Sequence, residues 1–399
     1  MQNAELADSA QCTVHSPQLK DKSNAECGKT EDSLSNCCAG RDGEPLADKA
    51  GKAETAGCEL RAAGCEHAAC HSERSEEPQP FKTGAAAKKV LITGAGSYIG
   101  NAVERRLTAA GHTVTVLDMM GDGWREFDFS GYDCVFHVAG IAHSKEKKRN
   151  EKLYWDINAE LPVEVAVKAR KMGVGQFVFM SSTSVYGGYG NKNITVSTPV
   201  KPKGYYGKSK LQADLELQAM NAEGFKVAVL RPPMIFGKGC KGNFPRLAKL
   251  AMKAPFFPDI KNRRSMLHID NLCEFVRLVV ENGSSGVFFP QNPDYFNTGN
   301  LVKEIAAARG KRLRLTRLFN LAVWAAYPFM QPLRKLFGNL TYDQAMSAHF
   351  GGAYQVVNNA ESVRRSVAEP SVCNPDLEAD VKGPIQGEET QSARGETNA

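Results

Sequence analysis

Short apolar runs alternate with stretches of helical periodicity through the middle of the 399-residue chain. Runs typical of buried strands lie at 88–93, 113–117, 134–138, 177–180 and 227–230. Over 155–171 the apolar residues Leu161, Val165 and Ala169 instead recur every four positions, which is typical of an amphipathic helix, and we expect a second helix over 206–222. This alternation predicts an α/β fold in which helices cover both faces of a doubly wound parallel sheet.

The first strand is followed by a glycine-rich turn. The sequence Gly94-Ala-Gly-Ser-Tyr-Ile-Gly100 separates it from a helical stretch that includes Val103 and Leu107, and the next strand ends at Asp118. Glycines let a backbone approach a pyrophosphate closely, and a helix N-terminus offers it unpaired N–H groups and a positive dipole. A carboxylate at this spacing accepts hydrogen bonds from the adenine ribose. The unit therefore predicts a dinucleotide site.

Asp118 also bears on the choice of dinucleotide. Its carboxylate would repel a 2′-phosphate, and the two residues that follow it, Met119 and Met120, supply no positive charge. This favours NAD over NADP as the cofactor. Arg125, a few positions later, keeps NADP open as an alternative.

A second chemical pattern follows the strand at 177–180. A hydroxyl-rich run, 181–187, comes first, and Tyr206 and Lys210 follow with a spacing of four residues. This spacing places both side chains on one face of a helix. An ammonium about 4 Å from a phenol is worth up to ~4 kcal/mol at an effective dielectric of about 20, or about three pKa units. Tyr206 is therefore a candidate general base, and the alternative is a surface Tyr and Lys on an ordinary helix.

Taken together, these motifs resemble those of the extended short-chain dehydrogenases/reductases, the group of nucleotide-sugar epimerases, dehydratases and reductases. The resemblance covers roughly residues 88–365 and rests on the motifs Thr93–Gly100, His137–Gly140, Asn158, Ser181–Gly187, Tyr206–Lys210, Leu230–Gly237 and Arg264–His268. One departure is visible, since Ser97 stands where the family usually has the second glycine of its turn.

The resemblance implies a role for each matching residue. Tyr206 would be the base, Lys210 its partner and a ligand of the ribose, and Ser182 the hydroxyl that holds the sugar oxygen. Asn158 would support the region of Lys210. The implied cofactor-binding residues are Gly94, Ser97, Tyr98, Ile99, Gly100, Asp118, Asp128, Phe129, Val138, Ala139, Gly140, Asn158, Tyr206 and Lys210, with Asp128 and Phe129 flanking the adenine. The implied substrate-binding residues are Ser182, Asn243 and Arg264.

The reaction that the resemblance implies is NAD-dependent epimerisation at C4 of a nucleotide sugar, as in UDP-glucose or UDP-N-acetylhexosamine 4-epimerases. Oxidation to a 4-keto sugar and return of the hydride to its other face would invert C4, and the product would serve surface polysaccharide synthesis. Dehydration is disfavoured, because Thr183-Ser184 replace the Asp–Glu pair of the dehydratases.

Two alternatives to epimerisation stay open. An NAD(P)H-dependent 4-keto-sugar-nucleotide reductase would use the same Ser, Tyr and Lys. A non-catalytic, NAD(P)-sensing Rossmann module is the second alternative, although such modules typically lack the Tyr or the Lys that this chain retains.

Composition predicts the organisation of the chain. Residues 1–82 carry a net charge of −6 and residues 376–399 one of −4, which leaves +16 for the body between them. Both acidic ends are poor in large apolar residues, so we expect them to be disordered. The predicted parts are a tail at 1–87, an NAD-binding core at 88–232 and 265–285, a smaller C-terminal substrate-binding region at 233–264 and 286–365, and a tail at 366–399.

The basic body raises the possibility of nucleic acid as a partner. Its Lys/Arg clusters at 145–149, 261–264 and 309–317 lack interleaved aromatic residues and match no nucleic-acid motif. We therefore expect a nucleotide-sugar substrate and no nucleic acid, since a positive field also attracts a small polyanion. A homodimer is possible.

Metal and membrane sites are not expected. Seven of the 11 cysteines lie within 1–82, but their spacing matches zinc motifs only weakly, so no metal is predicted. No stretch reaches the roughly 18 to 20 apolar residues that a membrane span needs, which favours a cytoplasmic protein. Residues 318–340 combine apolar and basic side chains, and we interpret them as a core-facing cap of the substrate-binding region, with an interfacial helix as the alternative.

Overall fold

The computed structural model of the chain describes residues 86–142, 146–187 and 192–368. The chain divides into two units, Met1–Ser72 and Glu73–Ala399, and all described residues belong to the second. The predicted acidic tails lie almost wholly outside the described residues, as do the seven cysteines of the first tail. Their predicted disorder stays a prediction.

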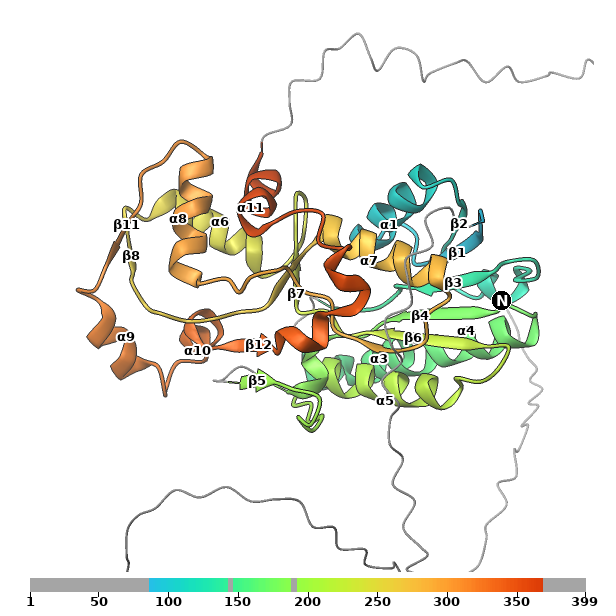
Figure 1. Cartoon of the computed structure of the whole chain (residues 1–399). Coiled ribbons are helices and arrows are strands. Elements are labelled where there is room, and N and C mark those ends of the chain that lie inside the picture. Colours follow the sequence, from blue (N-terminus) through green and yellow to red (C-terminus); the bar gives the residue numbers. More distant parts are fainter. Residues whose placement is uncertain (1–85, 143–145, 188–191, 369–399) are drawn as a thin grey trace, which may run out of the picture. The chain divides into compact units, whose positions relative to one another are not determined.

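A six-stranded parallel sheet forms the centre of the fold, with the strand order β10-β6-β4-β3-β1-β2 (Figure 1). Its strands are β1 Lys89–Thr93, β2 Thr113–Leu117, β3 Cys134–His137, β4 Gln176–Met180, β6 Lys226–Leu230 and β10 Gly286–Phe288. β1 pairs with β2 on one side and with β3 on the other, so the strand order reverses at β1. Ligands of such sheets bind at this switch point, beyond the carboxyl ends of the strands.

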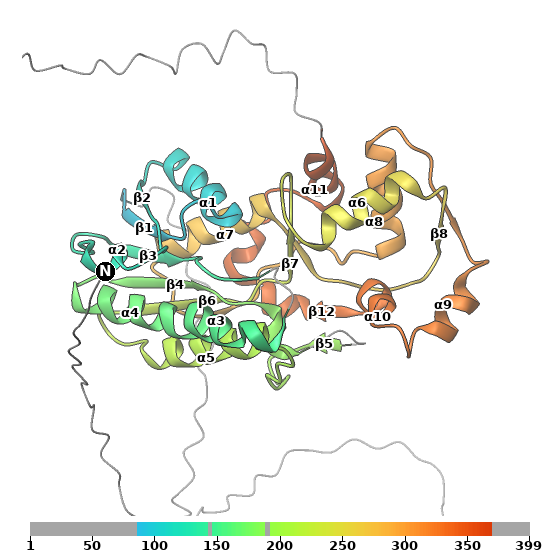
Figure 2. The same ribbon diagram turned by 180° about the vertical axis from the view of Figure 1, so that it is seen from behind.

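Helices cover both faces of the sheet, which confirms the doubly wound arrangement (Figures 1 and 2). Val90 and Ile92 of β1 point into a core shared with α1 (Tyr98–Ala109) and α7 (Ile269–Asn282). Leu91, between them, points into the opposite core with α4 (Leu161–Lys171) and α5 (Tyr205–Ala219). Successive residues of a strand point to opposite faces of the sheet, and here both faces are buried. The strands therefore appear in the sequence as continuous apolar runs.

The predicted substrate-binding region has a separate hydrophobic core. It is built around α6 (Asn243–Lys253) and α8 (Thr298–Ala308), with Val363 and Val367 of α11 (Asn359–Val367) packed into it. α11 continues two residues beyond the predicted boundary at 365. The remaining elements are three parallel strand pairs, β5 Lys192–Ile194 with β12 Leu340–Tyr342, β7 Met234–Phe236 with β9 Met266–His268, and β8 Phe256–Pro258 with β11 Arg314–Thr316, and the short helices α2 Gly123–Glu126, α9 Asn320–Ala326 and α10 Gln331–Phe337.

The single helix predicted over 155–171 is interrupted. It consists of the end of α3 (Glu151–Trp155), a π-helical turn at Asp156–Glu160, and α4. The extra residue of a π turn shifts the apolar period only locally, so the sequence pattern did not reveal it. The π-helical turn directs Asn158 into the protein interior, where its side chain is fully buried.

The segment at 318–340 is only in part the core-facing cap that the sequence predicted. Val323, Tyr327 and Leu336 do pack against the core of the substrate-binding region. Several larger apolar residues between 318 and 330 are instead exposed to solvent, so the prediction is wrong for the outer face of the segment. Within the described part of the chain, no helix has the length and apolar content to cross a membrane.

Candidate active site

The glycine turn after β1 touches the loop that follows β3. Gly94 has a φ of +114°, and a Cβ atom there would lie 2.9 Å from the backbone nitrogen of Ala139. Only glycine fits this conformation and this close approach. The backbone N–H groups of Val138 and Ala139 donate to the carbonyl of Thr93 at 3.2 and 3.0 Å. The predicted residues Gly94, Val138 and Ala139 are therefore brought together at the switch point of the sheet.

Ser97 has a structural role at the position where the resemblance implied a glycine. It is the N-cap of α1, and its Oγ accepts a hydrogen bond from the Gly100 N–H at 3.0 Å. A Cβ atom at Gly100 would lie 2.5 Å from this Oγ, so Gly100 makes room for the cap. The first helical hydrogen bond runs from the Asn101 N–H to the Ser97 carbonyl. The N–H groups of Tyr98 and Ile99 precede it and face the end of the helix where an anion binds.

The carboxylates predicted near the adenosine lie on the surface. Asp118 is exposed at the end of β2, where its Oδ1 accepts a hydrogen bond from the Met120 N–H at 3.0 Å. Asp128 is also exposed, and hydrogen bonds from the backbone N–H and hydroxyl of Ser130 lower its pKa. Both carboxylates are thus accessible to a ligand.

Phe129 and Arg125, which lie near these carboxylates in the sequence, have surroundings that the sequence did not predict. The side chain of Phe129 is fully buried in the core beneath α4, so it packs the protein interior and cannot flank an adenine; only its backbone could do so. Arg125, which kept NADP open, forms ion pairs with Asp122 at 3.2 Å and Glu164 at 2.6 Å. Its charge is therefore engaged by carboxylates of the protein.

Lys210 of α5 is buried beside the loop after β3. A Cβ atom at Gly140 would lie 3.2 Å from the Lys210 Nζ and 2.9 Å from the Asn158 Oδ1, so these three predicted residues converge. The Nζ also lies 4.6 Å from the ring centroid of Phe179. Burial lowers the pKa of Lys210 to about 7, although the nearby Asp214 opposes this shift. The predicted role of Tyr206 as a base depends on a charged Lys210, and this lowered pKa weakens that prediction.

Asn158 holds the loop in place from the π turn. Its Oδ1 accepts a hydrogen bond from the Ile141 N–H at 2.9 Å, and its Nδ2 donates to the Ile141 carbonyl at 3.0 Å. Both bonds fix the backbone just after Gly140. Asn158 therefore orients the loop that lies against Lys210, and its role in cofactor binding stays a prediction.

Tyr206 lies in the first turn of α5, one turn before Lys210, and is half-buried. The Glu146 carboxylate accepts hydrogen bonds from the N–H groups of Tyr205 at 3.0 Å and Tyr206 at 3.3 Å. An acceptor is needed here because Gly204, the N-cap, has no side chain, and a negative charge suits a helix N-terminus. Sequence reasoning missed Glu146, which is 60 residues from Tyr206 and belongs to no motif.

The two adjacent serines after β4 have different roles. Ser181 is buried and donates to Asp214 Oδ2 at 2.6 Å. Ser182 is half-buried and caps the 3₁₀ turn Thr183–Tyr186, where its Oγ accepts from the Ser184 N–H at 3.1 Å. A Cβ atom at Gly207 would lie 2.7 Å from the Ser184 carbonyl oxygen, so this turn packs directly on α5 beside Tyr206. The predicted trio of Ser182, Tyr206 and Lys210 is thus built on two elements in contact.

His137 is a buried histidine next to the site, and the sequence motif that contains it implied no role for it. His137 ends β3, its Nδ1 lies 2.7 Å from the Thr93 Oγ1, and its ring stacks between Phe177 and Phe179. Burial, together with the positive charge of Lys210, lowers its pKa to about 3. His137 is therefore neutral at physiological pH and serves the packing beneath Lys210.

The other two predicted substrate residues, Asn243 and Arg264, lie in the second region of the fold. Asn243 is exposed at the first position of α6. Arg264 is half-buried, its backbone pairs with Phe296, and its guanidinium donates to the Lys335 carbonyl. Their contacts with a substrate stay predictions.

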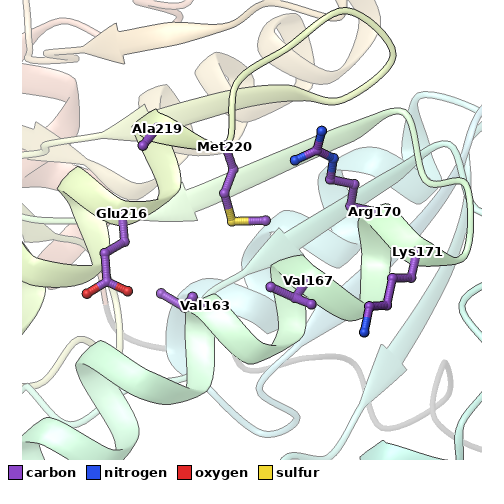
Figure 3. Close-up of a pocket in the computed structure, with 7 residues that line it drawn as sticks. All are labelled: Val163, Val167, Arg170, Lys171, Glu216, Ala219 and Met220. Carbon is purple, nitrogen blue, oxygen red and sulfur yellow. The ribbon is translucent and has the colours of Figure 1, made fainter. Parts of the chain in front are cut away.

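Two cavities lie away from these residues. One of about 510 Å³ lies between α4 and α5, where Val163, Val167 and Met220 face one another (Figure 3). Its charged lining residues are Arg170, Lys171 and Glu216, which form no catalytic grouping. In the part of the chain that the structure describes, no group of three or more His, Cys, Asp or Glu residues could hold a metal ion.

The residues at the switch point fit a dinucleotide. The Gly94 turn packs closely against the loop at Ala139, and the N-terminus of α1, which could hold a pyrophosphate, begins at this turn. Asp118 offers an exposed acceptor, and Lys210 a buried donor next to Gly140.

Known proteins share these features. The description "NAD dependent epimerase/dehydratase family" belongs to the family profile that matches residues 90–291. The UDP-glucose 4-epimerase of Vibrio cholerae is 29% identical over 255 residues, which are 56% of this chain and 76% of that relative. The N-acetyl-alpha-D-glucosaminyl-diphospho-ditrans,octacis-undecaprenol 4-epimerase of Escherichia coli O157:H7 is 29% identical over 192 residues, 46% of this chain and 57% of that relative.

A solved structure supports the fold. The Bordetella bronchiseptica enzyme WbmG in complex with NAD matches with a TM-score of 0.57 and 17% identity, over 72% of this chain and 95% of that one. The family profile spans the glycine turn, the Ser182 turn and the Tyr206–Lys210 helix. The chain therefore belongs to the NAD-dependent epimerase/dehydratase family of extended short-chain dehydrogenases/reductases, whose cofactor is NAD.

Proposed function

We propose that this protein is an NAD-dependent nucleotide-sugar 4-epimerase, in which Tyr206, Lys210 and Ser182 act on the sugar. The observation that carries the proposal is the convergence of Lys210 with Gly140 and Asn158 at the switch point of the sheet. This arrangement sets the helix that holds Tyr206 beside the loop where the dinucleotide would bind.

Each side chain has a distinct task in this proposal. Bound NAD⁺ would supply a hydride acceptor that can also return the hydride. Tyr206 takes the proton from the sugar O4 and later gives it back, which is general acid–base work. Lys210 stabilises the phenolate and holds a ribose hydroxyl, and Ser182 orients the sugar oxygen through its hydroxyl.

The relatives support an epimerase more than a dehydratase. The names of both curated relatives above state 4-epimerisation, one of a UDP-sugar and one of a sugar on an undecaprenyl diphosphate. Thr183 and Ser184 follow Ser182 in the 3₁₀ turn, so no carboxylic acid stands there to assist the loss of water. The substrate class that we propose is a UDP-hexose or UDP-N-acetylhexosamine.

A 4-keto-sugar-nucleotide reductase is the second candidate. Matching solved structures include the Pseudomonas aeruginosa enzyme RMD complexed with NADPH, at a TM-score of 0.56 and 20% identity, so the same fold also holds the phosphorylated cofactor. The ion pairs of Arg125 with Asp122 and Glu164 favour NAD and hence the epimerase.

Incubation of the purified full chain with a panel of UDP-sugars, with and without NADH, tests the proposal. Proton NMR of the products should show C4 inversion of one sugar without added NADH and without net change of the cofactor. Consumption of NADH with a 4-keto sugar would establish the reductase instead. Tight cofactor binding with no turnover of any sugar would favour the non-catalytic, NAD(P)-sensing module.

Three further expectations stay proposals. They are a cytoplasmic location, a role in surface polysaccharide synthesis, and a homodimer. Sedimentation velocity tests the last of these, since a homodimer has twice the mass of the 43.4 kDa chain.

A further inference from the structure

A cluster of exposed apolar side chains lies on and around α9. Leu318, Leu321 and Phe329 are 80%, 82% and 86% exposed, and Trp324 is 53% exposed. Phe319 and Met330, between and beside them, are exposed as well. We call these six residues the apolar edge. Contiguous exposed apolar groups of this size mark surfaces that bind something.

The apolar edge is held in place from its inner side. Val323 and Tyr327 pack against the core of the substrate-binding region, and the Asn320 Nδ2 donates to the Asp259 carbonyl at 2.8 Å. Leu321 points away from these anchors, and Trp324, three positions later, lies between the two faces, with its ring centroid 5.6 Å from that of Tyr327. Figure 1 shows α9 at the border of the substrate-binding region, next to β8 and β11. The exposed groups thus belong to a folded surface.

Basic residues flank the apolar edge without acidic ones among them. Residues 305–342 contain seven Lys or Arg and no Asp or Glu. Those seven are Arg309, Lys311, Arg312, Arg314, Arg317, Arg334 and Lys335. Arg314 lies on β11 opposite Phe256 of β8, which is also exposed. Arg317 forms an ion pair with Asp259, whose Oδ2 lies 3.5 Å from the Arg317 Nε. The segment that carries the apolar groups is therefore positively charged.

This pairing of exposed Leu, Phe and Trp with Arg and Lys matches an anionic bilayer surface. Apolar side chains enter the boundary between headgroups and acyl chains, and basic side chains bind lipid phosphates. A second copy of this chain would instead set two basic flanks against each other. A free sugar nucleotide would meet the charges but would leave the apolar side chains in water.

We propose that the apolar edge and its basic flank dock this protein onto the surface of a membrane that contains anionic lipid. The proposal goes beyond the proposed function and does not depend on which sugar, if any, the site converts. Docking would hold the substrate-binding region, which carries the apolar edge, against the bilayer.

Cosedimentation of the full chain with lipid vesicles tests this docking. Vesicles of phosphatidylcholine with added phosphatidylglycerol should bind the protein at least about tenfold more tightly than phosphatidylcholine alone, because the anionic headgroups attract the basic side chains near the surface. Added salt should weaken binding. The tryptophan emission should shift to the blue with anionic vesicles, and the conservative variant Trp324→Phe should lose that shift.

Two double variants separate the contribution of the apolar side chains to vesicle binding from that of the basic side chains. Leu321→Ser with Phe329→Ser should weaken vesicle binding about tenfold or more, since two large apolar groups are lost. Arg314→Gln with Arg317→Gln should weaken binding to anionic vesicles to a similar degree. The matched controls Val196→Ser and Lys226→Gln, which change an exposed apolar and an exposed basic residue elsewhere, should bind as the wild type does.

Three results would overturn the proposal. They are equal binding to neutral and anionic vesicles, unchanged binding by both double variants, and an emission shift that Trp324→Phe retains. A fall in oligomeric mass of Leu321→Ser/Phe329→Ser, with vesicle binding unchanged, would assign the apolar edge to contact with a second copy. Because these side chains are exposed, we expect the variants to unfold at the wild-type denaturant concentration, which confirms that their fold is intact.

Discussion

Arg231 holds Asp214 with two hydrogen bonds, from Nε to Oδ2 at 2.9 Å and from Nη2 to Oδ1 at 2.7 Å. Arg231 directly follows β6, and Asp214 lies one turn after Lys210 in α5. Ser181 donates to the same carboxylate from the end of β4. The pair thus ties the helix that carries Tyr206 and Lys210 to the carboxyl edge of the sheet.

Removal of one partner of this pair should destabilise the fold strongly. Asp214→Ala leaves the buried Arg231 without its carboxylate, and loss of one partner of a buried pair costs about 3–5 kcal/mol of unfolding free energy. Urea denaturation of the cofactor-free protein measures this. The control is Glu164→Gln, which breaks the solvent-exposed pair with Arg125 and should change stability little. If Asp214→Ala is as stable as the control, the pair does not anchor α5.

Lys210 should make the free energy of unfolding depend on pH between neutral and alkaline values. Its pKa is about 7 in the fold, against about 10.4 in an unfolded chain. Between these two pH values the unfolded chain binds more protons than the folded protein, so the free energy of unfolding rises with pH. Below pH 7 Lys210 is protonated in both states, and the cost of burying its charge then destabilises the fold in full. Lys210→Met removes this cost.

The measurement is the unfolding free energy of Lys210→Met and of the wild type, without cofactor, from pH 6 to pH 10. The variant's advantage over the wild type should be largest at about pH 6 and shrink as the pH rises. A difference that stays constant over this range would show that Lys210 is charged in the fold throughout. Lys226→Met, at an exposed position, is the matched control and should show no such trend.

Asp118 should select against a 2′-phosphate. We expect NAD(H) to bind at least about tenfold more tightly than NADP(H), which corresponds to about 1.4 kcal/mol. Asp118→Asn should reduce this preference by relieving the repulsion, while Asp122→Asn, an exposed carboxylate paired with Arg125, should leave a clear preference. Calorimetric titration with both cofactors gives the ratio. Equal or tighter binding of NADP(H) by the wild type would refute the assignment.

Local patterns explain what the sequence could predict. The unit from β1 to Asp118 is continuous in the chain, so the apolar runs, the turn glycines and the acid could be read together. Tyr206 and Lys210 share one helix, and their spacing alone places them on one face. The roles of these residues in catalysis came from the resemblance and stay proposals.

What the sequence could not predict depends on distant or context-dependent contacts. Glu146 meets Tyr206 across 60 residues, and no spacing rule links them. The resemblance placed Phe129 next to the adenine, but its side chain is buried in the core beneath α4. The apolar residues near Trp324 suggested burial, yet periodicity does not tell whether a partner element covers a helix face.

Tyr206 and Lys210 should act as one unit in catalysis. Lys210→Met should lower both the turnover and the affinity for NAD⁺, because the same ammonium serves the phenol and the ribose. In the double variant with Tyr206→Phe the losses in turnover should be less than additive. Strict additivity would mean that the two side chains act independently.

The most direct test of the proposed function is the turnover of Tyr206→Phe on the sugar that the panel identifies. This change removes one oxygen atom, so unfolding and NAD⁺ affinity should match those of the wild type. The account predicts that kcat falls by about 10² to 10⁴, the usual contribution of a positioned acid–base group. A Tyr206→Phe enzyme that retains nearly full kcat would contradict the account, because Tyr206 would then not be the base.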